Sequence, residues 1–210
     1  MTFLTWISGS LKRNRLLIGV VAATFISALF VSILVAFALF LVSPSLLKLI
    51  TAVLGTSNYT DVPQPYTSDL YRFIFLNNIG HFWNPLRIWV WIPFLGLFSL
   101  GYELVLNAVV IGGVVSFTSL TRGAAYAVAG VAPHGVFEIP AFILEFAALA
   151  RWHVTTSRAI YQRLSARRVE RALVVEGIKD TVLLSIVSIT LFALAAYVET
   201  FITPHFLGLQ

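Results

Sequence analysis

The stretch that decides the fold is Leu16–Val42, LLIGVVAATFISALFVSILVAFALFLV, which contains no charged side chain. A bilayer core about 30 Å thick needs roughly 20 apolar residues in a helix. Three basic residues, Lys12, Arg13 and Arg15, precede the stretch, as in a signal peptide. The apolar core of a signal peptide, however, has only about 7–15 residues. The stretch therefore predicts a retained transmembrane helix over residues 16–42.

The whole chain has the composition of a membrane protein. Of its 210 residues, 59% are hydrophobic and 11% are charged, whereas soluble domains are about 45–50% apolar and about 25% charged. This composition excludes an ordinary soluble enzyme and a disordered chain, and it argues against nucleic-acid binding despite the net charge of +5. The basic excess instead predicts membrane orientation and contact with anionic lipid headgroups. The chain has no cysteine, which excludes disulfides and thiolate metal sites.

Three further apolar regions follow the first helix. The region from Tyr71 to Leu120 is too long for one span and predicts two, with Asn84-Pro85 as a break or kink inside the first of them. Pro133 suits the first position of the next helix, and Pro204 closes the last. The predicted spans after the first cover residues 72–96, 100–121, 133–150 and 181–202. The expected fold class is all-α, a polytopic membrane helix bundle of about five transmembrane helices in a single integral membrane domain over residues 1–210.

The basic residues predict the orientation of these spans. Seven of them lie in the Arg-rich segment 151–179, which predicts a polar helical hairpin or a single amphipathic helix. With the N-terminus inside, these seven and the three before the first span are cytoplasmic, and the outer segments hold only Lys48, Arg72 and Arg122. This asymmetry follows the positive-inside rule. We expect a multi-pass plasma-membrane protein with a cytoplasmic N-terminus and a cytoplasmic segment 151–179.

Ionisable and amide side chains fall inside the predicted spans. Such groups are costly at bilayer depth, so they usually face the bundle interior and have partners. The 3.6-residue period of a helix places His134, Glu138 and Glu145 on one face. The topology predicts an outer polar cluster of Asn77, Asn78, His134, Glu138 and Glu199, and an inner one of Glu103, Asn107 and Glu145.

Small residues repeat every four positions in two of the predicted spans. Such stripes allow neighbouring helices to approach closely. We expect close helix contacts at the stripes Gly19, Ala23, Ser27 and Ala108, Gly112, Ser116.

Two interpretations of the polar groups stay open. In the structural one, which we favour, they bond to one another and fix the register of the helices. In the other, His134, Glu138, Glu199 and His205 are ligands of a metal ion or carriers of a proton. The sequence has no Gly-rich phosphate loop, HExxH or GxSxG pattern. We therefore assign no catalytic residue and expect no cofactor, with a divalent cation as the alternative.

The order of these motifs resembles a known family. Asn77-Asn78 opens a span, Asn107 follows about 30 residues later, PHGVFEIPA occupies residues 133–141, and Glu199 lies near the end of the last span. This arrangement, over roughly residues 70–205, resembles the stage II sporulation protein M family of bacterial and archaeal integral membrane proteins. Its most distinctive motif is Pro-His-Gly-x-x-Glu-x-x-Ala.

The resemblance implies a modest function. The sporulation member is similar to a membrane scaffold that places peptidoglycan-remodelling partners at the division septum, and it is not known as a hydrolase. We expect a membrane scaffold or membrane-assembly protein whose partners are lipid and other membrane or cell-envelope proteins, with a homo-oligomer left open. The alternative is a proton or divalent-cation transporter or channel that uses His134, Glu138 and Glu199, and a third interpretation is a metal-dependent membrane enzyme.

Overall fold

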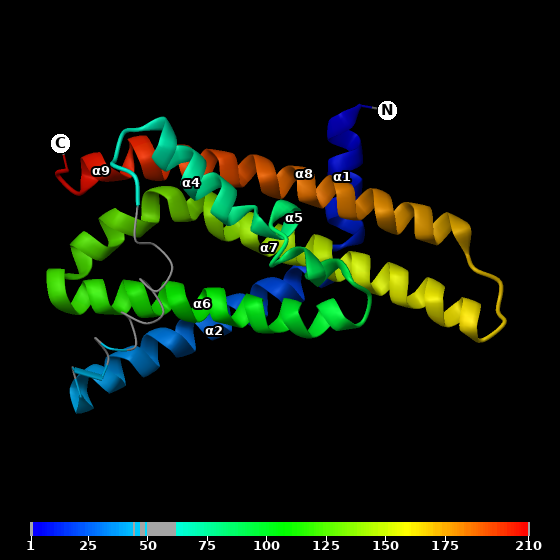
Figure 1. The fold of residues 1–210 in the computed structure, drawn as a ribbon, viewed down its shortest axis with the longest axis horizontal. Helices are drawn as coiled ribbons and strands as arrows, with labels where there is room; N and C mark the ends of the chain where they lie inside the picture. Colours follow the sequence, from blue (N-terminus) through cyan, green and yellow to red (C-terminus); the bar gives the residue numbers. More distant parts are fainter. Residues whose placement is uncertain (1, 44, 47–48, 50–61, 210) are drawn as a thin grey trace. The chain divides into compact units, whose positions relative to one another are not determined.

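The computed structural model describes residues 2–43, 45–46, 49 and 62–209, all of them in helices or short connections (Figure 1). Lys48 lies outside the described residues. The described elements are α1 (Phe3–Arg13), α2 (Arg15–Val42), α4 (Ser68–Asn78), α5 (Gly80–Trp83), the 3-10 helix η1 (Ile88–Trp91), α6 (Leu95–Arg122), α7 (Ala124–Leu164), α8 (Arg171–Phe201) and α9 (Thr203–Phe206).

Four of the described helices, α2, α6, α7 and α8, are long and apolar enough to cross a membrane. The predicted all-α membrane class is therefore confirmed, and the count is roughly consistent with the expected five. Most of the apolar surface of these helices stays exposed to the surroundings, as a lipid solvent requires: only 17% of the most apolar part of α2 is buried.

The helix predicted over residues 72–96, with a break or kink at Asn84-Pro85, is interrupted there and also at Ile79. The chain is helical in α4, breaks at Ile79, resumes as the single turn α5, and then forms η1. Pro85 causes the second break, because a proline ring disfavours the helical conformation of the residue before it, and Asn84 is extended with ψ 122°. The chain then turns at Phe94, which has a left-handed φ of 68°, and enters α6 at Leu95.

The predicted limits of the later helices also need correction. The helix predicted over 133–150 is longer: α7 runs from Ala124 to Leu164 without a break and contains both Pro133 and Pro140. Prolines are tolerated inside membrane helices where neighbouring groups satisfy the freed carbonyls. The Arg-rich segment 151–179 forms the end of α7, a short connection and the start of α8. Of the two predicted alternatives, the structure therefore has the helical hairpin and not the single amphipathic helix.

The chain forms two compact units, which we describe separately. Unit 1 comprises residues 1–23, 79–103 and 139–191, and unit 2 comprises residues 24–78, 104–138 and 192–210. The chain therefore passes from one unit to the other five times. Four of these passages lie inside α2, α6, α7 and α8, and the fifth lies between α4 and α5.

In unit 1, α7 and α8 are in close contact. A Cβ at Gly177 of α8 would lie 2.2 Å from Oγ1 of Thr155 on α7, so only glycine permits this approach. Further along the pair, the Ser188 hydroxyl donates to the carbonyl of Ala141 at 2.8 Å. The short helix α1 crosses the first part of α8 (Figure 1), where Nε of Arg13 donates to Oδ2 of Asp180 at 3.2 Å.

In unit 2, α2 contacts α6 at one of the two predicted stripes of small residues. The Ser32 hydroxyl donates to the carbonyl of Val109 at 2.9 Å, and a Cβ at Gly112 would lie 2.7 Å from that hydroxyl. At the first position of the other stripe, Gly19 in unit 1, no atom of the described residues lies within 4 Å of a Cβ built on the backbone. The buried face of α2 instead carries Phe25.

The connections within unit 2 are short. A single residue, Gly123 with a φ of 95°, joins α6 to α7. The segment before α4 is held against the end of the chain, since the Tyr66 amide donates to the carbonyl of Thr200 and its hydroxyl donates to that of Leu209.

Candidate functional site

The centre of unit 1 is a buried imidazole between two carboxylates. Nδ1 of His81 lies 3.0 Å from Oε1 of Glu145, and Nε2 of the same ring contacts Oε2 of Glu103. His81 is 1% exposed and Glu145 is fully buried. The Ser99 hydroxyl donates to the other oxygen of Glu103 at 2.8 Å. We call His81, Glu103 and Glu145 the inner triad.

Three elements position the inner triad. Glu103 lies on α6 and Glu145 on α7, whereas the ring comes from the single turn α5. The edge of the His81 ring packs on Phe146, with ring centres 5.6 Å apart. The backbone of the turn is held as well, because the Trp91 indole donates to the His81 carbonyl at 2.8 Å.

Two protons occupy the contacts of the inner triad. Both ring nitrogens face carboxylate oxygens, and each contact needs one proton. Either His81 is an imidazolium between two carboxylates, or it is neutral and one carboxyl group carries a proton, so the triad has a net charge of −1 in both cases. Arg87 is close enough for its charge to act on both Glu103 and Glu145. With Arg87 included, the charges of this buried set balance.

Side chains from α7 satisfy the backbone that the break after α5 exposes. The Trp152 indole donates to the carbonyl of Trp91 at 2.7 Å, and Nε2 of His153 donates to the carbonyl of Val90 at 2.8 Å. An unpaired carbonyl at membrane depth costs several kcal/mol, about as much as burying any polar group without a partner. These two bonds therefore allow non-helical backbone beside the inner triad.

Unit 2 contains a second polar set, which we call the outer set. Nδ2 of Asn78 donates to Oε1 of Glu138 at 3.1 Å, and Nε2 of His134 lies 3.7 Å from the other oxygen of Glu138. Nδ1 of His134 is 3.3 Å from the Thr203 hydroxyl at the start of α9. Glu199 is near enough for its charge to act on Glu138. The structure thus brings together Asn78, His134, Glu138 and Glu199.

The candidate metal ligands do not form a chelating group. His205 is exposed, and its Nδ1 lies 3.4 Å from the Tyr66 hydroxyl. Within the part of the chain that the structure describes, no three His, Asp or Glu side chains have an arrangement that could hold a metal ion. The inner triad does not chelate an ion either, since the two nitrogens of the His81 imidazole point in opposite directions and cannot share one ion.

Asn77 and Asn107 are the two remaining residues of the predicted clusters. Asn77 precedes Asn78 on α4, and Asn107 lies one turn beyond Glu103 on α6 but belongs to unit 2. Both make interactions of their own.

Sequence reasoning missed two buried groups. His81 was not assigned to the inner cluster, although an ionisable residue in an apolar stretch is itself a signal of an interior position. Asp180 was not assigned to any cluster. It is fully buried and forms an ion pair with Arg13 through Oδ1. A guanidinium nitrogen of Arg151 lies 3.6 Å from its Oδ2.

Comparison of the sequence with known proteins shows the family of the chain. The model of the family named Stage II sporulation protein M matches residues 27–204. The chain belongs to the stage II sporulation protein M family. Both polar sets lie within the matched residues. An uncharacterized protein of Methanocaldococcus jannaschii is similar, with 32% identity over 103 residues, which are 49% of this chain and 55% of the relative. The chain thus matches about half the length of that relative. No solved structure matches the chain.

Proposed function

We propose that this member of the family is a multi-pass membrane scaffold or membrane-assembly protein. The observation that carries the proposal is that buried polar side chains from different helices bond to one another: His81 contacts Glu103 and Glu145, and Asn78 donates to Glu138. Paired buried groups of this kind fix which helices meet and in which register. A protein that presents surfaces to partners needs such a defined bundle.

The proposal includes a location and an orientation. We place the protein in the plasma membrane with its N-terminus in the cytoplasm, together with the turn between α7 and α8. The support is the excess of Lys and Arg around α1 and in residues 151–179.

A pair of substitutions at Glu138 tests the structural role of the outer set. Glu138→Gln keeps an oxygen that accepts from Asn78, so we expect a free energy of unfolding within about 1 kcal/mol of the wild type. Glu138→Leu leaves the Asn78 amide without its acceptor, which costs about 1–3 kcal/mol. Unfolding in mild detergent measures both. The matched control is the double variant Asn78→Leu/Glu138→Leu, in which the Asn78 amide is no longer stranded, so that part of the loss should be recovered.

A flux measurement separates the scaffold from the transporter. The purified protein is placed in vesicles that contain either a pH-sensitive or a Mn²⁺-sensitive dye, and a gradient of H⁺ or Mn²⁺ is imposed. For a scaffold, we expect the wild type and Glu138→Gln to give the same flux as vesicles without protein. A protein-dependent flux that Glu138→Gln abolishes would overturn the proposal in favour of the transporter.

A further inference from the structure

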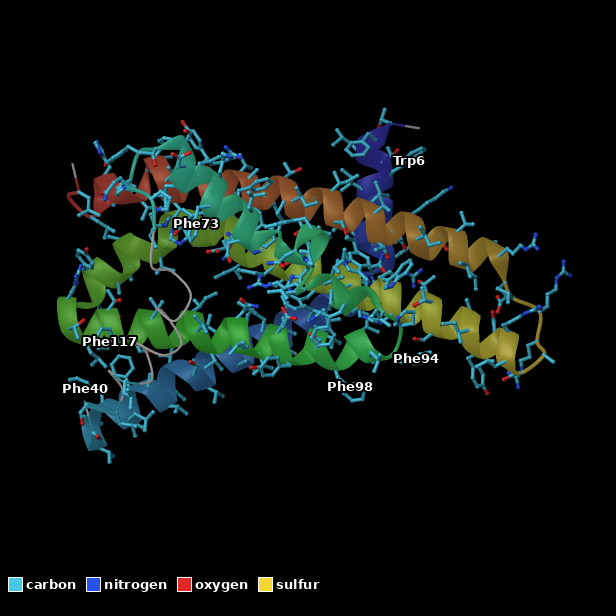
Figure 2. All side chains as sticks on the ribbon, viewed as in Figure 1. Trp6, Phe40, Phe73, Phe94, Phe98 and Phe117 are labelled. Carbon is cyan, nitrogen blue, oxygen red and sulfur yellow. The ribbon has the colours of Figure 1, made fainter. Side chains whose placement is uncertain are left out.

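An apolar groove lies between α1 and the first half of α8 within unit 1. It has a volume of about 920 Å³, which is at the upper end of the roughly 300–1,000 Å³ of small-molecule sites. Trp6 of α1 forms part of one wall, and Val175 and Val182 of α8 form part of the other. All three side chains are at least 50% exposed, and Figure 2 shows Trp6 on the outer part of α1.

Some of the charged side chains that the structure describes around the groove pair with one another, and two basic side chains do not. Arg13 donates to Asp180 and lies 3.3 Å from Glu176, while Arg151 approaches Asp180 from α7. These two cations and two anions neutralise one another. Arg171 and Lys179 also line the groove, and neither forms an ion pair with any described residue. The groove therefore has two positive charges to offer beside its apolar walls.

The helix α1 has the composition of a helix that lies at a membrane surface. It carries exposed Phe3, Leu4 and Trp6, and it ends in Lys12 and Arg13 where the membrane-spanning α2 begins. Helices of this kind lie in the headgroup region with their apolar side chains among the acyl chains. Basic pockets between helices at that depth bind anionic lipid headgroups.

We propose that the groove is a binding site for one anionic phospholipid of the surrounding bilayer. The lipid phosphate pairs with Arg171 and Lys179, and an acyl chain lies along Trp6, Val175 and Val182. A free phosphate ion would leave the apolar walls exposed to water, and a zwitterionic lipid would leave the two positive charges uncompensated. The site is separate from both polar sets and goes beyond the scaffold role.

Native mass spectrometry of the full chain in detergent, with phosphatidylglycerol or phosphatidylcholine added, tests the proposal. We expect phosphatidylglycerol to bind more tightly than phosphatidylcholine. Each basic residue near an anionic surface contributes about a factor of five, so Arg171→Gln/Lys179→Gln should weaken phosphatidylglycerol binding about 30-fold. The matched control is Arg163→Gln/Arg167→Gln, which removes the same charge from exposed positions outside the groove and should stay within about threefold of the wild type.

Three results would overturn the proposal: equal binding of the two lipids, equal weakening in the control variant, or no weakening in a correctly folded Arg171→Gln/Lys179→Gln variant. A further variant tests whether a second copy of the chain covers the groove instead. Because the chain has no cysteine, Trp6→Cys reports contacts at the groove alone. If Trp6→Cys forms disulfide-linked dimers and added phosphatidylglycerol does not lower their yield, the groove is covered by a second copy of the chain and the lipid proposal is wrong.

Discussion

At the scale of single residues, His81 joins α6 and α7. Its ring contacts the partly exposed Glu103 on one side and the fully buried Glu145 on the other, so each carboxylate has a partner. The net strength of such a set depends on its completeness, because the desolvation cost is repaid only while all partners are present.

The inner triad gives a prediction about stability. His81→Leu strands a buried carboxylate at Glu145 and should lower the free energy of unfolding in mild detergent by about 3–5 kcal/mol. Adding Glu145→Leu removes the stranded group, so the double variant should recover at least half of that loss. His205→Leu is the control, because His205 is exposed, and its effect should stay within about 0.5 kcal/mol. Additive losses in the double variant would contradict the pairing.

The sequence was enough to predict several members of the polar sets, but not the buried His81 and Asp180. Helical periodicity placed His134 and Glu138 on one face of α7, where the structure has them. His81 could not be assigned by periodicity, because the helix that contains it is one turn long. Asp180 lies at the edge of an apolar run, where an acidic residue is usually interpreted as the solvated end of a span, but in the structure it is buried beside Arg13 of α1 and Arg151 of α7.

At the scale of elements, the corner between η1 and α6 explains the departure from a regular helix. The chain turns at Phe94 with a left-handed φ, and the start of α6 then lies against the η1 backbone. A Cβ at Gly96 would be 1.9 Å from the carbonyl oxygen of Val90 and 2.9 Å from the ring of His153. Only glycine fits there while His153 donates to that same carbonyl.

Two alanine substitutions in one helix test this corner. Gly96→Ala must displace the backbone of Val90, so we expect a loss of at least about 2–3 kcal/mol in the free energy of unfolding. The added Cβ of Gly101→Ala, five residues later in α6, meets no atom within 4 Å in the part of the chain that the structure describes. It should be neutral or stabilise the helix by up to about 1 kcal/mol. Thermal unfolding of the two variants compares them, and equal melting temperatures would contradict the geometry of the corner.

Apolar run length was enough to predict most of the long helices but not their limits. A polar residue flanks the apolar run of α2 at each end, and the predicted helix 16–42 differs from the observed one only by starting one residue later. The prolines of α7 could not be told from a helix start by sequence alone, because tertiary contacts decide whether a proline begins a membrane helix or lies inside it. In the region 72–96, the donors that stabilise the break come from Trp152 and His153, more than 50 residues away.

At the scale of the whole molecule, the number of membrane crossings can be measured directly. The chain passes five times between its two units, and one passage is the interrupted segment between α4 and α5. If that segment crosses the membrane, Thr2 and Ser165 lie on the same side and Thr121 on the other. A membrane-impermeant maleimide should then label Thr2→Cys and Ser165→Cys only from the cytoplasm, and Thr121→Cys only from outside. Labelling of Thr2→Cys and Ser165→Cys from opposite sides would show that the interrupted segment does not cross and that the chain has four crossings.

The single-residue connection at Gly123 has a consequence for biogenesis. A nascent chain leaves the ribosome helix by helix, and a long loop would allow each helix to enter the lipid by itself. A single residue leaves no such loop between α6 and α7. We therefore expect the two helices to insert as one hairpin, so that the carboxylates of both enter the bilayer in a single insertion event.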